Sequence, residues 1–418
     1  MNQIVYGEAR DQPLTGVRVV DFTRMLAGPF CTAMLADAGA EVIKVENPKG
    51  GDDTRHFAPR VGDESAFFLM INRGKKSIAI DLKSQAGLDI VLDLVRHSDV
   101  VIENFKPGVA QKLGIGYESL KKVNASLVYA SISGYGQSGP FAHRPAYDII
   151  AQAVGGIMSV NGNKGMEPTR VGESIGDIAA GLYTAWAVSA ALYRRSETGR
   201  GECIDVAMVD SIFSMLVTGL SEYLYAGRVP EPIGNSHPIS APLDSFRARD
   251  GHIIIAVAND RLFGQLCAAM NKAELAIDPR FSTDPERKRN DTLLKEIIES
   301  WSTELSVDEA VEILDRAAVP ASPILSLDRV ANSEHAAWRR LVRNVAHPSL
   351  GQIRLVPQPV KFGGSAEAEI GPPPRLGEHT RKVLKECLGL SDSRIARLRD
   401  IGALGTFDSS ATSEKRAS

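Results

Sequence analysis

Hydrophobic positions in the first half of the chain fall into short continuous runs, separated by stretches of helical period. The short runs predict buried strands, and they cover residues 17–22, 42–45, 77–82, 100–105 and 127–131. A helix is expected over 30–38, and another after Ser84, where apolar residues recur at helical spacing and the serine can cap the first turn. Strands that alternate with helices predict βαβ units and a mostly parallel sheet, in which ligands gather at the carboxyl ends of the strands.

The pattern changes after residue 227. Prolines crowd the segment 230–242, which indicates a loop, and 252–258 has the apolar run of a strand. Helices are expected over 260–271, 287–303 and 306–318, the last opened by a capping box of Ser306 and Glu309. Residues 350–361 return to β patterning, and a further helix is expected to begin near Glu378. These elements predict a smaller second domain.

Composition agrees with a globular protein of more than one domain. The chain has 418 residues, 44% of them hydrophobic and 24% charged, and such a length exceeds what one core usually serves. The net charge of −3 gives no general attraction to nucleic acid or to an anionic membrane, so any anion site must be local. The four cysteines, Cys31, Cys203, Cys267 and Cys387, form no CxxC pair. We expect them to be buried, reduced thiols of a cytoplasmic protein.

Neither end of the chain nor its longest apolar stretch predicts a membrane segment. Residues 1–13 are polar and charged, unlike a signal peptide, and 406–418 are polar and expected to be disordered. The longest apolar stretch, 178–193, is shorter than the ~20 residues that a membrane span needs. We therefore expect 178–193 to form a buried helix.

Two matches to known motifs lack the structural context that each motif requires. Residues 134–139 fit GxGxxG, but Pro140 follows and no helix is expected before Ala146, which argues against dinucleotide binding and favours a flexible glycine loop. Residues 172–176 fit GxSxG, but the segment before them is loop-like where a nucleophile elbow needs a strand. Ser174 as the nucleophile of a hydrolase is kept as an alternative.

Asp177 stands just before the apolar stretch and follows Gly176. From spacing alone it is an N-cap residue, which accepts hydrogen bonds from the backbone N–H groups of the helix. A carboxylate placed at a helix start after a glycine-rich loop is also held, exposed and stabilised as an anion. Such a carboxylate can act as a covalent nucleophile.

The chain resembles the family III CoA-transferases, the family of formyl-CoA transferase and crotonobetainyl-CoA:carnitine CoA-transferase. The similar segments are, in chain order, 14–23 (LTGVRVVDFT), 27–29, 39–46 (GAEVIKVE), 51–55, 72–77 (NRGKKS), 103–105, 107–108, 134–140 (GYGQSGP), 146–148 (AYD), 152–153, 198–201, 234–235, 237–238, 278–281 and 377–379 (GEH). Each segment is short, but the ordered set is specific and runs nearly end to end.

The resemblance implies the chemistry and its residues. Asp177 matches the family's nucleophilic aspartate. In that family the reaction proceeds through a mixed anhydride and an aspartyl-CoA thioester on this residue and needs no metal. Tyr147 and Asp148 match a pair beside the thioester. Coenzyme A is then a substrate rather than a permanently bound cofactor. The positions implied to bind it are Met25, Ala27, Lys83, Asn104, Phe105, Lys106 and Lys112.

Departures from the formyl-CoA transferase pattern bear on the substrates. Its Lys before the Ala-Tyr-Glu motif is Pro145 here, a Gln of its opening loop is Leu26, and its glycine run is the shorter 234–238. These changes argue against formate and oxalate and for a larger acyl group. Arg144 or Arg170 can pair with a second carboxylate, which favours a dicarboxylate such as succinate, glutarate or malate, with succinyl-CoA as the donor. His237 lies in a loop expected to cover the site.

Three other functions are compatible with parts of this sequence. An α-methylacyl-CoA racemase of the same superfamily has a His where this chain has Tyr147, so its acid–base pair is incomplete here. A thioesterase-type hydrolase would depend on Ser174. An acyl-CoA-binding protein without activity would have no use for Asp177.

The resemblance also implies the architecture. A large Rossmann-like α/β domain is expected from both chain ends, with a parallel sheet, a smaller α+β domain inserted between, and an interlocked homodimer. The expected boundaries are 1–204 for the first part of the large domain, 205–227 and 329–350 for linkers, 228–328 for the small domain, and 351–405 for the part that completes the large one.

Overall fold

The computed structural model describes residues 12–365 and 369–405, so the expected disorder of 406–418 and most of the polar N-terminus lie outside the described residues. The chain divides into two compact units. The first joins Met1–Ile157, Val171–Val217 and Ala337–Ser418, and the second joins Met158–Arg170 and Thr218–Ala336. A short loop before Asp177 therefore groups with the second unit, which the sequence did not predict.

The first unit is built on a six-stranded parallel sheet. Its strands, in spatial order, are β5 (Lys76–Ala79), β2 (Glu41–Glu46), β1 (Arg18–Asp21), β6 (Val100–Glu103), β7 (Val128–Ser133) and β8 (Glu202–Ala207). This is the order of a doubly wound Rossmann sheet, in which the direction of winding reverses between β1 and β6. Ligands of such sheets bind outside the carboxyl ends of the strands at that reversal.

Helices cover both faces of the sheet, because adjacent strand residues point to opposite sides. The helices of the first unit are α1 (Ala27–Asp37), α2 (Ala66–Ile71), α3 (Gln85–Arg96), α4 (Val109–Lys112), α5 (Tyr117–Val123), α6 (Asp148–Val154), α8 (Ile175–Thr198), α9 (Met208–Met215), α17 (Thr380–Leu388) and α18 (Asp392–Asp400). Val19 packs with α1, α8 and α9, whereas Val20 packs with α3, α5, α17 and α18. Short pieces complete it: α7 (Ile157–Val160) and α16 (Glu334–Arg339) at the unit boundaries, η1 (Asp53–His56), and the strands β3 (Arg60–Val61) and β4 (Glu64–Ser65).

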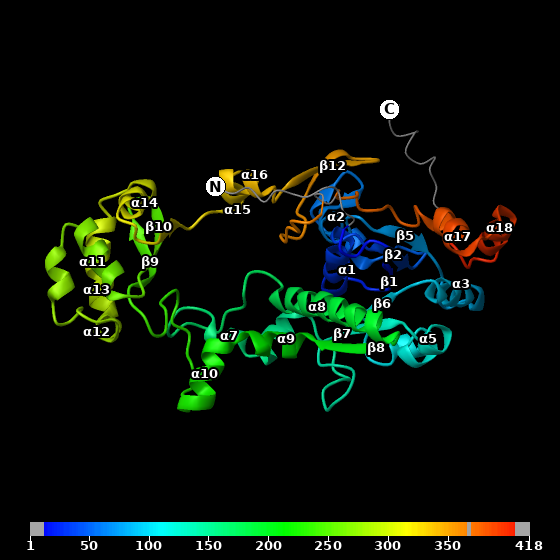
Figure 1. Ribbon diagram of the computed structural model, residues 1–418, viewed down its shortest axis with the longest axis horizontal. Coiled ribbons are helices and arrows are strands. Elements are labelled where there is room, and N and C mark those ends of the chain that lie inside the picture. The colour runs from blue at the N-terminus through cyan, green and yellow to red at the C-terminus, as the bar shows by residue number, and fades with distance from the viewer. Residues whose placement is uncertain (1–11, 366–368, 406–418) are drawn as a thin grey trace. The chain divides into compact units, whose positions relative to one another are not determined.

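The C-terminal part completes the first unit with helices rather than with strands of the main sheet. Helix α17 packs on β5 and α3, as Figure 1 shows at the red end of the chain. Among the described residues, one isolated bridge joins Ile80 to Leu404, and β12 (Arg343–His347) pairs with β13 (Gly351–Leu355) and with no other strand. Both chain ends thus build this unit, but every strand of its large sheet comes from the N-terminal part.

Helix α8 is longer and less buried than predicted. It has 24 residues, enough in length and composition to cross a membrane, and it is the one described helix that meets that test. One face packs on α1, β7 and β8, as expected of a core helix. Its other face is exposed, and Trp186 and Tyr193 keep 70% and 74% of their accessible surface. The prediction of a buried helix is therefore wrong for half of its surface.

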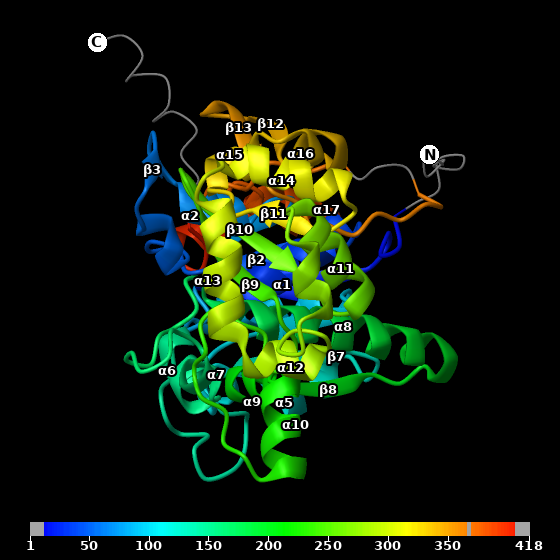
Figure 2. The same cartoon turned by 90° about the vertical axis from the view of Figure 1, so that its left-hand side faces the viewer.

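The second unit is an α+β body around a three-stranded antiparallel sheet (Figure 2). Its strands are β9 (Leu243–Ala248), β10 (Gly251–Ala256) and β11 (Ala321–Pro323). Its helices are α10 (Val217–Ala226), α11 (Asp260–Ala269), η2 (Ala273–Ile277), α12 (Asp284–Arg289), α13 (Asp291–Ser302), α14 (Val307–Arg316) and α15 (Leu327–Ala331). The predicted capping box of Ser306 and Glu309 opens α14 with both of its hydrogen bonds.

The cysteines correct one expectation. None forms a disulfide, and Cys31 and Cys267 are buried as predicted. Cys203 is exposed, however, and Cys387 is only half-buried. Cys203 lies on β8, the last strand of the main sheet, where only one neighbouring strand covers the backbone.

Candidate active site

Asp177 lies in the first turn of α8, whose N-cap is Ser174. The prediction of Asp177 as the cap itself is therefore wrong, because the helix begins two residues before it, at Ile175. Its carboxylate instead faces the backbone N–H of Ala27, the first residue of α1, and this polar group lowers the pKa of the carboxylate. Two helix N-termini thus converge on one carboxylate, and both favour negative charge there.

The electrostatic surroundings of Asp177 are nevertheless unfavourable to its charge. Burial, and then the nearby carboxylate of Asp148, raise the pKa of Asp177 to about 7, and the backbone N–H of Ala27 opposes this shift only in part. A carboxylate with poor solvation and a raised pKa is a stronger base and nucleophile than an exposed aspartate. Such perturbed groups are concentrated at functional sites.

Asp148 holds the start of α8. It is buried at the first turn of α6, its Oδ1 accepts the backbone N–H of Gly176 at 2.8 Å, and its Oδ2 accepts the side-chain amide of Gln152 at 2.7 Å. A Cβ at position 176 would lie 3.1 Å from Asp148 Oδ1 and 3.0 Å from Ile212 Cδ1, so any larger residue would require these two side chains to shift. Sequence reasoning found Asp148, but it gave Gln152 no role.

Tyr147 precedes Asp148 at the N-cap position of α6. Its ring keeps 71% of its accessible surface. The structure therefore places Tyr147 as an exposed aromatic next to the buried Asp148.

A buried ion network supports the loop that presents the Ala27 N–H. Lys44 is fully buried; its Nζ lies 2.9 Å from Asp52 Oδ2 and donates to the carbonyl of Thr23 at 2.7 Å. Asp52 Oδ1 in turn accepts the backbone N–H of Met25 at 3.3 Å. Met25 has a φ of 67°, a left-handed conformation that is costly for a residue with a Cβ. The network thus fixes a strained turn between β1 and α1.

Asn104 fixes the same turn from β6. Its Oδ1 accepts the backbone N–H of Arg24 at 2.8 Å, and its Nδ2 donates to the carbonyl of Arg24 at 2.7 Å. These two bonds join the loops after β1 and β6 at the reversal point of the sheet. The amide of Asn104, expected to bind CoA, is engaged with the protein backbone here.

The other residues implied to bind CoA are spread over the carboxyl ends of two strands. Phe105 follows β6 and packs against the core, and its backbone N–H donates to Glu103 at 2.8 Å. Lys106 and Lys112 are exposed beyond the same strand, and Lys83 is exposed beyond β5. The structure leaves these lysines available to an anionic ligand.

The three residues expected near the acid substrate belong to different units of the chain. Arg144 is exposed in the first unit, with its guanidinium 4.3 Å from the centre of the Phe141 ring. Arg170 belongs to the second unit. His237, also in the second unit, is half-buried, and its backbone N–H donates to the carbonyl of Leu243 at 2.9 Å.

Both rejected motifs have the geometry expected of loops. No strand lies between α7 and Ser174, so Ser174 is not on a nucleophile elbow. The glycine segment 134–139 is followed by coil until α6 at Asp148, and Gly136 has a φ of 87°. The backbone N–H of Gln137 there donates to Asp205 at 2.9 Å.

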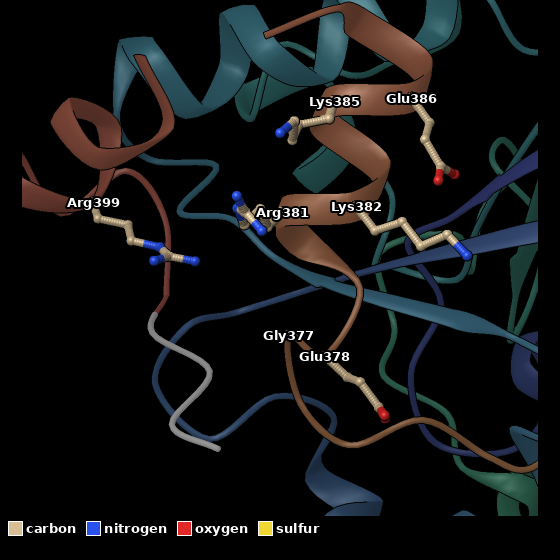
Figure 3. A pocket seen from close by; sticks show the side chains of 7 residues that line it. All are labelled: Gly377, Glu378, Arg381, Lys382, Lys385, Glu386 and Arg399. Carbon is tan, nitrogen blue, oxygen red and sulfur yellow. The ribbon is translucent and has the colours of Figure 1, made fainter. Parts of the chain in front are cut away.

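A separate basic pocket lies on the first unit between α17 and α18 (Figure 3). It has a volume of about 540 Å³ and is lined by Gly377, Glu378, Arg381, Lys382, Lys385, Glu386 and Arg399. None of the residues predicted for the site lines this pocket. Over residues 12–365 and 369–405, no group of His, Cys, Asp and Glu side chains is arranged to hold a metal ion.

The chain matches a family model and characterised proteins over nearly its whole length. The model of CoA-transferase family III covers residues 14–380. Acetyl-CoA:oxalate CoA-transferase of Acetobacter aceti is 41% identical, with 90% of this chain and 95% of that protein covered. Succinyl-CoA:glutarate CoA-transferase of Mus musculus is 37% identical, with 94% and 90% covered.

A solved structure shares the fold. The crystal structure of a CAIB/BAIF family protein from Brucella suis aligns with a TM-score of 0.81 at 37% identity, over 90% of this chain and all of that one.

Proposed function

We propose, from the premise that this chain belongs to CoA-transferase family III and transfers coenzyme A between acyl-CoA and a free acid, that Asp177 is its covalent nucleophile. The observation that carries the proposal is the carboxylate itself: half-buried, raised in pKa to about 7, and facing the N–H of Ala27. A merely structural aspartate at a helix start would be stabilised as an anion, with a lowered pKa.

The reaction begins with the Asp177 carboxylate attacking the thioester carbonyl of the donor. The C–S bond breaks, CoA thiolate leaves, and an acyl–aspartyl anhydride remains. The thiolate then attacks the aspartyl carbonyl carbon, the donor acid leaves as a carboxylate, and an aspartyl-CoA thioester forms. The acceptor carboxylate attacks this thioester and expels the thiolate again. The thiolate finally attacks the acceptor acyl carbon of the new anhydride, which releases acceptor-CoA and regenerates the carboxylate.

The N–H of Ala27 has a defined role in these steps. Each attack on the aspartyl carbonyl places negative charge on the oxygen that faces Ala27. A fixed backbone donor at a helix N-terminus stabilises that charge without reorganisation. The strained turn at Met25, held by Lys44, Asp52 and Asn104, keeps this donor in place.

We propose that the acceptor is a dicarboxylate. The named relatives support this, since they act on oxalate and glutarate. The relative from Acetobacter aceti also removes the argument against oxalate, so oxalate belongs in the test. A panel of mono- and dicarboxylates with succinyl-CoA and acetyl-CoA tests the proposal. Preference for monocarboxylates with both donors would contradict it.

We propose that Arg144 or Arg170 pairs with the second carboxylate of the acceptor. Arg144 lies shortly before Asp148 in the sequence and Arg170 shortly before Asp177, and a guanidinium group can bind a carboxylate through two hydrogen bonds. Of the variants Arg144→Gln and Arg170→Gln, the one that removes the pairing group should raise KM for a dicarboxylate and leave KM for the acyl-CoA within about twofold. An unchanged dicarboxylate KM in both variants would remove them from this role.

We propose that the enzyme is a homodimer. Its support is exposed apolar surface: no residue of α10 is buried within one chain, and Leu224 and Tyr225 keep 64% and 90% of their surface. Apolar surface of this extent marks association sites. Light scattering coupled to gel filtration should give twice the mass of the 45.0 kDa chain; a monomer at micromolar concentration would contradict the proposal.

We also propose a cytoplasmic location, supported by the four free cysteines, since reduced thiols persist in that compartment. Fractionation of cells that carry a tagged full chain tests it, with recovery outside the cytoplasm as the contradicting result.

A further inference from the structure

The chain that leads to Asp177 changes its attachment shortly before the helix. Up to Arg170 it groups with the second unit, where the carbonyl of Gly162 accepts the backbone N–H of Gly234 at 2.8 Å. From Val171 onward it groups with the first unit. The short segment 171–176 is therefore the place where Asp177 must be secured to the unit that carries the Ala27 donor.

Gln152 provides this attachment with one side chain. Its Oε1 accepts the backbone N–H of Val171 at 2.8 Å, and its Nε2 donates to the carbonyl of Glu173 at 3.1 Å. The same Nε2 donates to Asp148 Oδ2 at 2.7 Å, and Asp148 Oδ1 accepts the N–H of Gly176 at 2.8 Å. The amide thus contacts the segment near its beginning and middle, and its end through Asp148.

Burial of a polar amide such as that of Gln152 costs free energy unless hydrogen bonds replace those that it makes with water. The Gln152 side chain is fully buried in α6, where an apolar residue would pack without a need for hydrogen bonds. Ala151, beside it in sequence, is equally buried and apolar. Every polar atom of the Gln152 amide has a partner, and each partner lies on segment 171–176 or on its anchor, Asp148.

We infer that Gln152 is a positioning residue, which fixes segment 171–176 and Asp148 and thereby sets the Asp177 carboxylate opposite the Ala27 N–H. The inference rests on the proposed role of Asp177 as the nucleophile. Reactivity of a bound pair depends steeply on geometry, and a displacement of about 1 Å costs roughly a hundredfold in rate. Loss of the amide should therefore impair chemistry and leave the binding of CoA nearly unchanged.

The test uses Gln152→Met, which keeps the length and bulk of the side chain and removes its hydrogen bonds. We expect kcat to fall about 10- to 100-fold, KM for the acyl-CoA to stay within about threefold, and adduct formation on Asp177 in a single turnover to slow by the same factor as kcat. Amide hydrogen exchange in 171–176 should become faster. Gln85→Ala, which removes an exposed amide bonded to Asp89, is the matched control and should match the wild type.

The outcomes separate this inference from the proposed function. If the wild-type enzyme turns over without any adduct on Asp177, the nucleophile assignment fails. If the wild type forms the adduct and Gln152→Met forms it at the same rate, or raises only KM, the positioning role fails. Should Gln152→Met not fold, Gln152→Asn, which keeps the amide on a shorter stem, replaces it, with the same slowed adduct expected and the same two results overturning the inference.

Discussion

The backbone N–H of Ala27, at the first residue of α1, faces the carboxylate of Asp177 in the first turn of α8 and lowers the pKa of that carboxylate. This contact joins the loop after β1 to the helix before β8, at the carboxyl edge of the sheet where a doubly wound fold binds its ligands.

Replacing Asp177 by Asn should abolish transfer and stabilise the fold. Turnover should fall by at least about 10³-fold, because an amide does not form the anhydride. The pKa of Asp177 is raised to about 7 in the folded protein, so the destabilisation that it causes is fully present above about pH 7 and is lost as pH falls from there toward the lower pKa of the unfolded chain. Urea unfolding should show the variant about 1–2 kcal/mol more stable at pH 8, with a smaller difference at pH 5.

The pH profile should report the same group. Only the carboxylate form attacks, so kcat/KM should fall roughly tenfold per pH unit below about 7. Asp148→Asn removes the neighbouring charge that raises the pKa of Asp177, and it should move the midpoint of this limb to lower pH. Asp89→Asn, on the exposed face of α3, is the charge-matched control. An acidic limb of kcat/KM with the same midpoint in Asp148→Asn as in the wild type would contradict the role of the Asp148 charge in raising the pKa of Asp177.

Gly181 tests the close approach of α8 to α1. A Cβ at this position would lie 2.8 Å from the carbonyl oxygen of Ala27 and 3.1 Å from the Phe30 ring. Gly181→Ala should cost about 1–3 kcal/mol and lower kcat, because it pushes apart the helices that hold Asp177 and its donor. Gly264→Ala in α11 meets nothing within 4 Å and should stabilise the fold by about 0.5–1 kcal/mol. Thermal unfolding of both variants decides the matter.

Asn104→Ala distinguishes two roles for one residue. The sequence implies a CoA contact, which would raise KM for the acyl-CoA and leave kcat. In the structure, the side-chain amide of Asn104 bonds to both backbone groups of Arg24. Its removal should loosen the loop after β1, lower kcat by about tenfold and change KM less. Steady-state kinetics with one donor at saturating acceptor separates the two results.

Local signals in the sequence were sufficient for much of the fold. The strand runs, the cap at Ser84 and the capping box at Ser306 appear as predicted, since each depends on neighbouring residues. The cap assigned to Asp177 failed because the helix extends back through Ile175 and Gly176, against the low helix propensity of glycine. Tertiary packing on α6 and α9 overrides propensity there.

The site was predictable only where a motif carried it. Asp148 and Gln152 both stood in segments similar to the family, but the resemblance implied a role for Asp148 alone. The role of Gln152 depends on hydrogen bonds to positions 19 and 21 residues away, which only the fold reveals. The Lys44–Asp52 ion pair joins a strand to a loop, so no hydrophobic periodicity in the sequence predicts it. Cys203 shows the same limit, because exposure on an edge strand depends on sheet order.

The most direct test of Asp177 as the nucleophile is the mass of its peptide after brief incubation with acyl-CoA and trapping by hydroxylamine or borohydride. The account predicts a modification on Asp177 in the wild type that is absent in Asp177→Asn. Rapid turnover with Asp177 unmodified, or a trapped adduct on another residue such as Ser174, would contradict it.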